Sequence, residues 1–489
     1  MEWTIYISFL GALGVLLVPE KFTRITALGA AVLGLIIGFN GAIEFGGGPV
    51  YQYLVRVSWI TSLGIDYSLA VDGISVTMVL LTGLAAIAGV LFSWNIERRI
   101  REYFAFYLTL IGGVYGVFLS ADLFLLFVFY EIAIVPKYFL IAIWGSTRKE
   151  YGAMKLVLYS FVGSALVLIG MIAAYVAAGT GTFDLQSLAA TGFSPTIQDW
   201  VFPLVFVGFA VLAGMWPFHT WAPTGHVAAP TATSMLLAGV VMKLGAYGAL
   251  RVAMTLFPEG MLYWRDFIAV LAVIGIVYGA LVAWTQKDFK FVIGYSSVSH
   301  MGFVLLGLAT LNLVGLSGAV LQMFSHGIIA GLLFAVVGRM IYDRTHTRSL
   351  EELRTMGLRA KLPFVAIAFT VAGLASMGMP GFSGFVAEVM VIIGAWHSYP
   401  ILGIIAGAGI VIGVTYTLKT IQLVFYNDED GSVTEGEELP PITIPEKVGA
   451  WMLMLTSLLV GLYPRVLLDW IDPAFQTPMF DGLGKAVGW

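Results

Sequence analysis

The stretch LFLLFVFYEIAIVPKYFLIAIW (123–144) is long and apolar, yet it holds two ionisable residues near its middle, Glu131 and Lys137. About 20 apolar residues suffice to span the hydrocarbon core of a bilayer as a helix. An ionisable side chain at that depth costs about 2.5–3.5 kcal/mol on insertion scales, and such residues commonly line ion or proton pathways. The stretch therefore predicts a transmembrane helix that carries a functional charged site.

The composition extends this prediction to the whole chain. Of the 489 residues, 59% are hydrophobic and only 11% are charged, and the mean hydropathy is +0.92. The apolar runs are long and continuous, unlike the short alternating segments of a membrane β-barrel. We therefore expect an all-α polytopic membrane protein with about fourteen transmembrane helices. The expected spans are 3–19, 24–43, 72–94, 102–120, 122–145, 154–178, 201–218, 229–250, 267–285, 290–310, 313–341, 363–396, 401–426 and 447–464.

The loop charges predict the orientation of these spans. Lysine and arginine gather in alternate loops, as in segments 98–101, 148–155 and 339–361, and such loops usually face the cytoplasm. We therefore expect an inner or plasma membrane location with both termini on the outer, periplasmic side. On that outer side, residues 55–73 predict an amphipathic hairpin or strand pair that caps the bundle.

Several kinds of site are excluded by what the sequence lacks. The chain has no cysteine, which excludes disulfides and cysteine-ligated iron–sulfur clusters. It has no Walker A loop and no strand-led dinucleotide-binding motif. We therefore expect no cofactor and no metal in the chain. Its expected surroundings are the lipid bilayer and other membrane subunits, with no nucleic acid.

Two expected spans are interrupted by glycine and proline: FVGFAVLAGMWPFHTWAPTGHVAAP (206–230) and TVAGLASMGMPGFSGFVAEV (370–389). They are helices 7 and 12, five apart, so the units that contain them have opposite orientations. Broken helices at matching positions of inverted halves indicate a transport site near the middle of the membrane. The sequence therefore predicts two inverted five-helix repeats.

These repeats divide what we expect to be a single membrane domain, 1–489. The expected parts are the N-terminal helices 1–3 (1–100), the first repeat with helices 4–8 (101–251), the inverted repeat with helices 9–13 (266–426), and the last helix with a short tail (447–489).

Further ionisable residues lie inside the expected spans, and we expect them to transfer protons together with Glu131 and Lys137. They are Lys243, His300, His326, Glu388 and Lys419. By the repeat offset, Glu131 corresponds to His300 and Lys243 to Lys419. Lys243 is a candidate partner for Glu131, because a nearby cation keeps a buried carboxylate charged. The histidines titrate near neutral pH and suit a relay, and Glu388, after the second interruption, is the expected outlet.

Each of these residues has a structural alternative. A buried charge can belong to a permanent ion pair, and a buried histidine can be a satisfied core residue. Lys419 can lie deep or near the membrane interface. His219 and His226 suit proton uptake at the inner end or plain loop packing. For Lys290 the positive-inside rule is a sufficient explanation.

Three segments resemble the antiporter-like subunits of respiratory complex I, the NADH-quinone oxidoreductase. They are YEIAIVPKYFLIAIWG (130–145), PFHTWAPTGHVAAPTATSMLLAGVVMKLGAYGALR (217–251) and KDFKFVIGYSSVSHMGFVLLGL (287–308). The resemblance covers about 70–425. It implies fourteen helices with inverted five-helix repeats and proton translocation driven by electron transfer in distant subunits. The chain would then be part of an enzyme without doing redox chemistry itself.

The resemblance also implies site residues and partners. The family's proton-transferring roles carry over to Glu131, Lys243, His300, His326 and Glu388. Sister subunits of the L and N types usually carry lysine where Glu388 stands. The implied partners are these L and N types and the small K and J types. Quinone, flavin and iron–sulfur clusters are expected in partner subunits.

The sequence departs from the family in one respect. Members usually have a lysine in helix 7, seven residues before the histidine of PFHTW, paired with the glutamate of helix 5. Here that position is Leu212, whereas Lys137 occupies a position that is usually apolar. We predict that Lys137 supplies the missing ammonium group.

Other functions remain open at this point. One is a cation/proton antiporter subunit of Mrp type, or a related module of a membrane hydrogenase or an inorganic-carbon transporter. Another is a scaffold that has lost pumping and only links its neighbours. Leu212 favours this hypothesis because the family usually has a lysine at that position.

Overall fold

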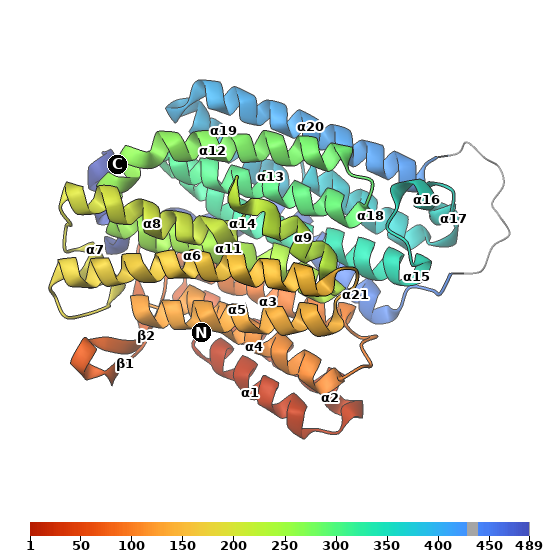
Figure 1. Ribbon diagram of the computed structural model, residues 1–489, viewed down its shortest axis with the longest axis horizontal. Helices are drawn as coiled ribbons and strands as arrows, with labels where there is room; N and C mark the ends of the chain where they lie inside the picture. Colours follow the sequence, from red (N-terminus) through yellow and green to blue (C-terminus); the bar gives the residue numbers. More distant parts are fainter. Residues whose placement is uncertain (428–438, 489) are drawn as a thin grey trace.

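The long apolar runs of the sequence form long helices that lie side by side (Figure 1). The computed structural model describes residues 1–427 and 439–488, and every statement about the fold refers to these. One end of the bundle carries a β-hairpin and α7, and the opposite end carries α15, α16 and α17 (Figure 1). The basic segments 98–101, 148–155 and 339–361 belong to the second end, because they connect helices there.

Each expected span has a helical counterpart in the described residues. In chain order these are α1 (Trp3–Leu17), α2 (Glu20–Phe45), α3 (Gly73–Phe92), α4 (Ile100–Leu119), α5 (Leu123–Trp144), α6 (Lys149–Ala178), α8 (Pro195–Ala213) with α9 (Trp221–Ala228), α10 (Thr231–Leu236) to η4 (Ala249–Met254) by way of α11 (Met242–Gly248), α12 (Pro258–Thr285), α13 (Phe289–Thr310), α14 (Leu313–Phe334), α18 (Pro363–Ser376) with α19 (Ser383–Ser398), α20 (Pro400–Phe425) and α21 (Ile444–Leu462).

Length and composition support a polytopic membrane protein. Within the described residues, 11 helices are long and apolar enough to cross a membrane, or up to 12 if α21 and α22 (Arg465–Ala474) form one bent span. The helices α1, α18 and α19 are apolar but shorter. The expected count of fourteen therefore stays a prediction.

The remaining elements are short and connect the long helices. They are η1 (Thr61–Leu63), α7 (Leu185–Ala189), η2 (Phe218–Thr220), η3 (Leu237–Val241), η5 (Ala335–Tyr342), α15 (Asp343–Thr345), α16 (Leu350–Arg354), α17 (Leu358–Lys361), η6 (Pro478–Phe480) and α23 (Asp481–Val487).

The expected strand pair near residues 55–73 is present as a hairpin. Strands β1 (Gln52–Ile60) and β2 (Ile65–Val71) are antiparallel, with Gln52 opposite Val71 and Ile60 opposite Ile65. At the turn, Gly64 has φ +67, and a Cβ there would lie 1.8 Å from the Gly181 carbonyl oxygen. Only glycine fits so close an approach of two backbones, so the hairpin and the α6–α7 loop lock together.

Both interruptions expected from the sequence break their helices. Helix α8 ends at Gly214, which has φ +80, and the chain resumes as a helix only at η2 and α9. Between α18 and α19, Gly378 and Gly381 have φ +73 and +99. A broken helix frees backbone carbonyl and amide groups, which a membrane tolerates only where they are buried in protein or line a cavity. The breaks are therefore the places to look for a site.

Three π-helical segments were not expected from the sequence: η3, η4 and η5. A π-helical turn inside an α-helix leaves backbone groups with altered partners and is frequent at functional sites. Segment η3 directly precedes Lys243. The sequence pattern alone could not show it, because apolar residues surround the turn on both sides.

One buried ion pair holds the hairpin end together. Arg251 at the end of the α10–η4 span donates to Asp72, the N-cap residue of α3, and their side chains are 1% and 0% exposed. The guanidinium also lies 5.6 Å from the ring centroid of Phe480. Removing one partner of such a buried pair commonly costs about 3–5 kcal/mol, so the pair ties α3 to the C-terminal segment.

Candidate functional site

Lys243 and His326 form the first part of the candidate site. Lys243 on α11 is fully buried, and its ammonium group donates to His326 Nδ1 on α14 at 2.7 Å. It also donates to the Ala238 carbonyl oxygen in the π-helical turn η3. When Lys243 is charged, its ammonium group can only donate hydrogen bonds, so His326 then accepts at Nδ1 and carries its own proton on Nε2. The expected pairing of Lys243 with Glu131 is not seen among the described residues, where the partners of the lysine are His326 and Ala238.

His300 and Glu388 form the second part. His300 Nδ1 on α13 lies 3.1 Å from Glu388 Oε1 on α19. The other ring nitrogen, Nε2, lies 3.1 Å from the Ser376 hydroxyl at the end of α18. Gln322 Nε2 approaches Nδ1 at 3.4 Å. A ring proton on Nδ1 can be donated to the carboxylate, while Nε2 accepts from the hydroxyl.

The break between α18 and α19 positions Glu388. A Cβ at Gly378 would lie 2.6 Å from Glu388 Oε2, so the carboxylate rests against the bare backbone of the break. The left-handed conformation of Gly378, with φ +73, requires glycine in any case. The helix break at Gly378 thus leaves room for the buried carboxylate of Glu388 and holds it in place.

The two parts meet at a small cavity. The rings of His300 and His326 are stacked with centroids 5.4 Å apart. Both line a cavity of about 10 Å³ together with Ser325 and Glu388, roughly the space that one water molecule needs. His326 Nε2 is buried without a hydrogen-bond partner among the described residues. Lys243, His326, His300 and Glu388 thus form a nearly continuous series of proton-exchanging groups.

A chain of hydroxyl groups leads away from the same cavity. Ser325 Oγ lies 2.8 Å from Ser383 Oγ at the start of α19, which lies 3.0 Å from Ser457 Oγ on α21. All three side chains are buried. A hydroxyl both donates and accepts, so this chain can reverse its direction by rotation. Apart from the position of Ser383 after the helix break, no sequence pattern predicted this chain.

Glu131 and Lys137 lie apart from this series, on α5. Lys137 is fully buried, and its ammonium group has no hydrogen-bond partner among the described residues. Glu131 is half-buried beside Ser164 of α6 and interacts electrostatically with Lys137. Leu212 on α8, where the family usually has lysine, is 1% exposed. Lys137 thus points into the protein, and Glu131 is the carboxylate that its charge acts on.

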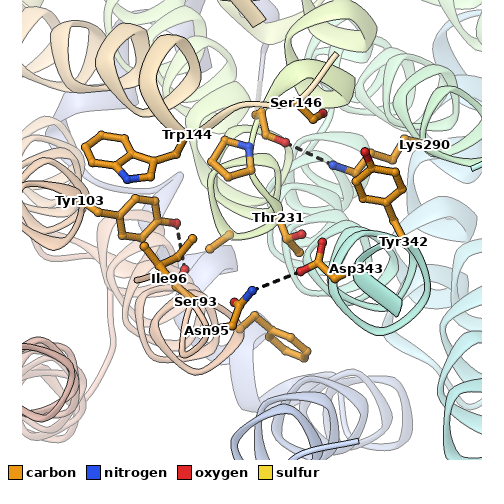
Figure 2. A pocket seen from close by; sticks show the side chains of 14 residues that line it. Ser93, Asn95, Ile96, Tyr103, Trp144, Ser146, Thr231, Lys290, Tyr342 and Asp343 are labelled. Atoms are coloured by element: carbon orange, nitrogen blue, oxygen red, sulfur yellow. Dashed lines mark hydrogen bonds between the residues drawn. The ribbon is translucent and has the colours of Figure 1, made fainter. Parts of the chain in front are cut away.

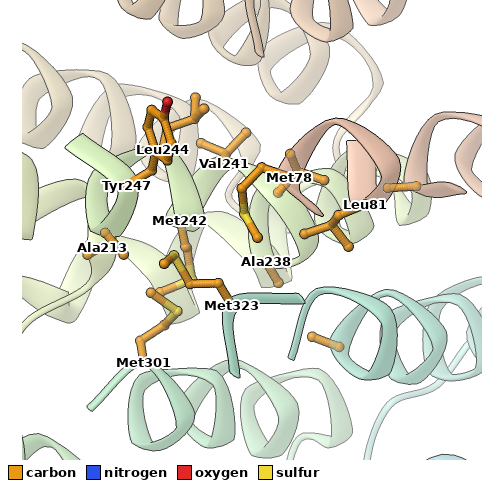
Figure 3. Packing of buried hydrophobic residues seen from close by; sticks show 14 of the residues in the cluster. Met78, Leu81, Ala213, Ala238, Val241, Met242, Leu244, Tyr247, Met301 and Met323 are labelled. Atoms are coloured by element: carbon orange, nitrogen blue, oxygen red, sulfur yellow. The ribbon is translucent and has the colours of Figure 1, made fainter. Parts of the chain in front are cut away.

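Apolar side chains pack where α3, α11, α13 and α14 meet. Figure 3 shows Met242, Met301 and Met323 pointing toward one another. Ala213, at the end of α8, belongs to the same cluster. No hydrogen bond or ion pair of the described residues crosses from Glu131 or Lys137 to Lys243. The polar series is therefore continuous in one half of the molecule only.

The other candidates divide by burial. Lys419 is exposed on α20, and the structure does not bring it to the cavity, so its role stays a prediction. Lys287 is exposed as well, but Lys290 is only 2% exposed. The positive-inside rule is thus not a sufficient explanation for Lys290. His219 and His226 are both buried. Among the described residues, no three histidine, aspartate or glutamate side chains form a group that could hold a metal ion.

The structure resembles subunits of known membrane complexes. A chain of respiratory complex I from Thermus thermophilus with bound NADH matches with a TM-score of 0.90 and 26% identity, covering 99% of both chains. A chain of the Mrp complex from Dietzia sp. matches with a TM-score of 0.84 and 21% identity, covering 99% of this chain and 98% of that one. At that identity the second match shows the fold alone.

Sequence comparison gives the family. Residues 120–413 match the family described as NADH:quinone oxidoreductase/Mrp antiporter, TM. NADH-quinone oxidoreductase subunit M of Rhodobacter capsulatus is 37% identical over 452 residues, covering 90% of this chain and 86% of the relative. NAD(P)H-quinone oxidoreductase chain 4 of Gloeobacter violaceus is 34% identical over 479 residues, covering 96% and 90%. The chain therefore belongs to the NADH:quinone oxidoreductase/Mrp antiporter family, in the branch that contains subunit M and chain 4.

Proposed function

We propose that this chain is the proton-translocating, antiporter-like membrane subunit of an NADH-quinone oxidoreductase, driven by quinone reduction in distant subunits. The observation that carries the proposal is the series Lys243, His326, His300 and Glu388 inside an apolar bundle. The chain itself supplies no redox group in this proposal, and quinone, flavin and iron–sulfur clusters belong to partner subunits. The partners are other membrane subunits, including the L and N types and the small K and J types.

The geometry supports a stepwise transfer. A charged Lys243 donates its proton to His326 Nδ1, and His326 releases the proton from Nε2 toward the cavity. His300 takes up that proton and passes its own from Nδ1 to Glu388. Glu388 then releases the proton toward the outer side. His326 and His300 are left as the opposite tautomers, so each ring must turn over or exchange its proton before Lys243, recharged by a new proton, starts the next transfer.

We also propose the number of transmembrane helices, the two repeats and the orientation of the chain in the membrane. The chain would form fourteen transmembrane helices with repeats at 101–251 and 266–426, one single membrane domain, and both termini on the outer side of an inner or plasma membrane. Two observations support this. The helices α8 and α18 break at the two places where the repeats require it. The basic loop segments gather at the end opposite the β-hairpin (Figure 1).

The test uses the assembled complex in sealed vesicles. Lys243→Ala and Glu388→Gln should abolish the proton pumping that depends on this chain, measured as acidification during NADH oxidation. The exposed Lys287→Ala is the matched control and should pump normally. The amount of assembled complex is measured for each variant. Normal pumping by Lys243→Ala in fully assembled complex would refute the proposal and favour a scaffold role.

A second candidate function is a cation/proton antiporter subunit of Mrp type. The family description and the fold of the Dietzia Mrp chain both favour it. It predicts sodium-dependent proton exchange in vesicles without NADH and without quinone-reactive subunits. Copurification with NADH- and quinone-reactive subunits, with no effect of sodium on pumping, favours the first proposal instead.

A further inference from the structure

A polar cavity opens near the end of the bundle opposite the hairpin. Its volume is about 230 Å³, room for several water molecules at about 30 Å³ each. Figure 2 shows Tyr103 and Trp144 on one side and Lys290, Tyr342 and Asp343 on the other. The cavity lies where α3, α5 and η5 end and α13 begins. Because α3 starts at the hairpin, its other end marks this as the inner end in the proposed orientation.

Lys290 is the buried cation of this cavity. It lines the wall, is only 2% exposed, and its ammonium group donates to the Ala229 carbonyl oxygen at 3.2 Å. A lysine that only marked the inner side of a membrane would extend into water. A lysine held inside the protein beside a water-sized space can instead exchange protons with that space.

His226 lies deeper, one helical turn before Ala229 on α9. It is fully buried, and neither ring nitrogen has a hydrogen-bond partner among the described residues. Its ring packs against Phe334, with centroids 5.2 Å apart. An unpaired buried polar group is costly, and native proteins keep few of them. Plain loop packing would be better served by an apolar side chain.

Charges on both sides act on His226. Its ring is within electrostatic range of Lys290 at the cavity and of Lys243 in the candidate site, and it also interacts with His326. His219, the other buried histidine of this region, faces Tyr278 and Tyr295 and interacts with Lys155. His226 lies three residues before Ala229, which accepts from Lys290 at the cavity wall, and it also interacts with Lys243. The ring nitrogens of His219 have no partner among the described residues either, but its charged neighbour is Lys155.

We propose that protons enter from the inner end through this cavity and reach Lys243 by way of Lys290 and His226. Neutral Lys290 takes a proton from water in the cavity. It passes that proton to one nitrogen of His226, and His226 releases the proton on its other nitrogen to neutral Lys243. Lys290 ends neutral, Lys243 ends charged, and His226 ends as its other tautomer, so its ring must turn over or exchange its proton before the next transfer. This inference rests on the proposed function, because it assumes that Lys243 feeds the relay.

The first test compares four variants of the complete complex in sealed vesicles. His226→Gln and Lys290→Met should lower pumping to the level of Lys243→Ala, because glutamine and methionine cannot be protonated. His219→Gln is the matched control and should pump normally. Normal pumping by His226→Gln beside an inactive Lys243→Ala overturns this inference and leaves the proposed function standing. Normal pumping by Lys243→Ala means that the proposed function itself has failed.

A second test does not depend on pumping, and it uses the absence of cysteine from the chain. Ser146→Cys places one thiol in the cavity wall, and Ser457→Cys places one in the buried interior as a control. A membrane-impermeant maleimide should label Cys at 146 in this chain from the inner face only and should not label the control. Labelling from the outer face, or none from either face, overturns the inference even where a His226 variant fails to assemble.

Discussion

The two halves of the molecule treat their buried charges differently. In the half built from α11, α13, α14 and α19, Lys243, His326, His300 and Glu388 follow one another at hydrogen-bond or ring-stacking distance. On α5, Glu131 and Lys137 interact only through their electric fields, and the lysine ammonium has no hydrogen-bond partner among the described residues. Apolar side chains, Met242 among them, pack where α3, α11, α13 and α14 meet.

This difference teaches that buried charges of one bundle can be connected or isolated whatever their place in the chain, since Lys243 lies within 101–251 as Glu131 and Lys137 do. Hydrogen-bonded groups can hand over protons directly, whereas isolated charges can only raise or lower the energy of a proton elsewhere. We therefore interpret the α14 half as the conducting part. The pair on α5 is interpreted as an electrostatic control element that responds to its surroundings.

The largest effect is expected from cutting the conducting half at its centre. His326→Phe keeps an aromatic ring in the stack but removes both nitrogens between Lys243 and His300. Pumping should fall by about a hundredfold, the size of effect that a positioned proton-transfer group typically contributes. The measurement is vesicle acidification per assembled complex. Glu131→Gln, the matched change on α5, should have a clearly smaller effect, and equal losses would break the comparison between the halves.

The second prediction tests whether Lys137 replaces the lysine that the family usually has at the position of Leu212. Lys137→Met should lower pumping by about tenfold, which corresponds to about 1.4 kcal/mol. The double variant Glu131→Gln/Lys137→Met should be no worse than either single variant, because coupled residues are not additive.

A rescue experiment sharpens the same point. Leu212→Lys added to Lys137→Met returns an ammonium group to the buried face of α8 and should recover most of the pumping. Leu212→Met is the size-matched control and should recover none. Additive losses in the double variant, together with no rescue by lysine at position 212, would show that Lys137 has a different role.

Much of the fold follows from local signals in the sequence. The apolar runs predicted where the helices lie, and Gly214, Gly378 and Pro380 predicted both helix breaks. The hairpin followed from residues 55–73. The π-helical turns did not, because the residues of η3 are as apolar as those of any span and the turn depends on tertiary packing around Lys243.

Four of the seven residues predicted from the sequence lie together in the structure, but their pairings were not predicted. Depth in an apolar run identified Lys243, His300, His326 and Glu388, because each is costly there. The partner of Lys243 is His326 rather than Glu131, and no local pattern distinguishes the two, since both contacts join distant segments. The burial of the Lys290 side chain was not predicted for a related reason. A lysine at a helix start satisfies the positive-inside rule whether its side chain turns outward or into the protein.

The smallest effect is expected from the hydroxyl chain that leads from the cavity to α21. Ser383→Ala removes its middle member and should lower pumping by about two- to threefold, since one neutral hydrogen bond contributes about 0.5–1.5 kcal/mol. Ser457→Ala should have a similar effect, and the double variant should be no worse, because one break already interrupts a linear chain. Ser164→Ala, which removes the hydroxyl beside Glu131, is the control from the other half and should pump normally. A loss of pumping with Ser164→Ala as large as that with Ser383→Ala would mean that hydroxyl groups matter equally in both halves. The distinction between a conducting half and a controlling half would then rest on His326 alone.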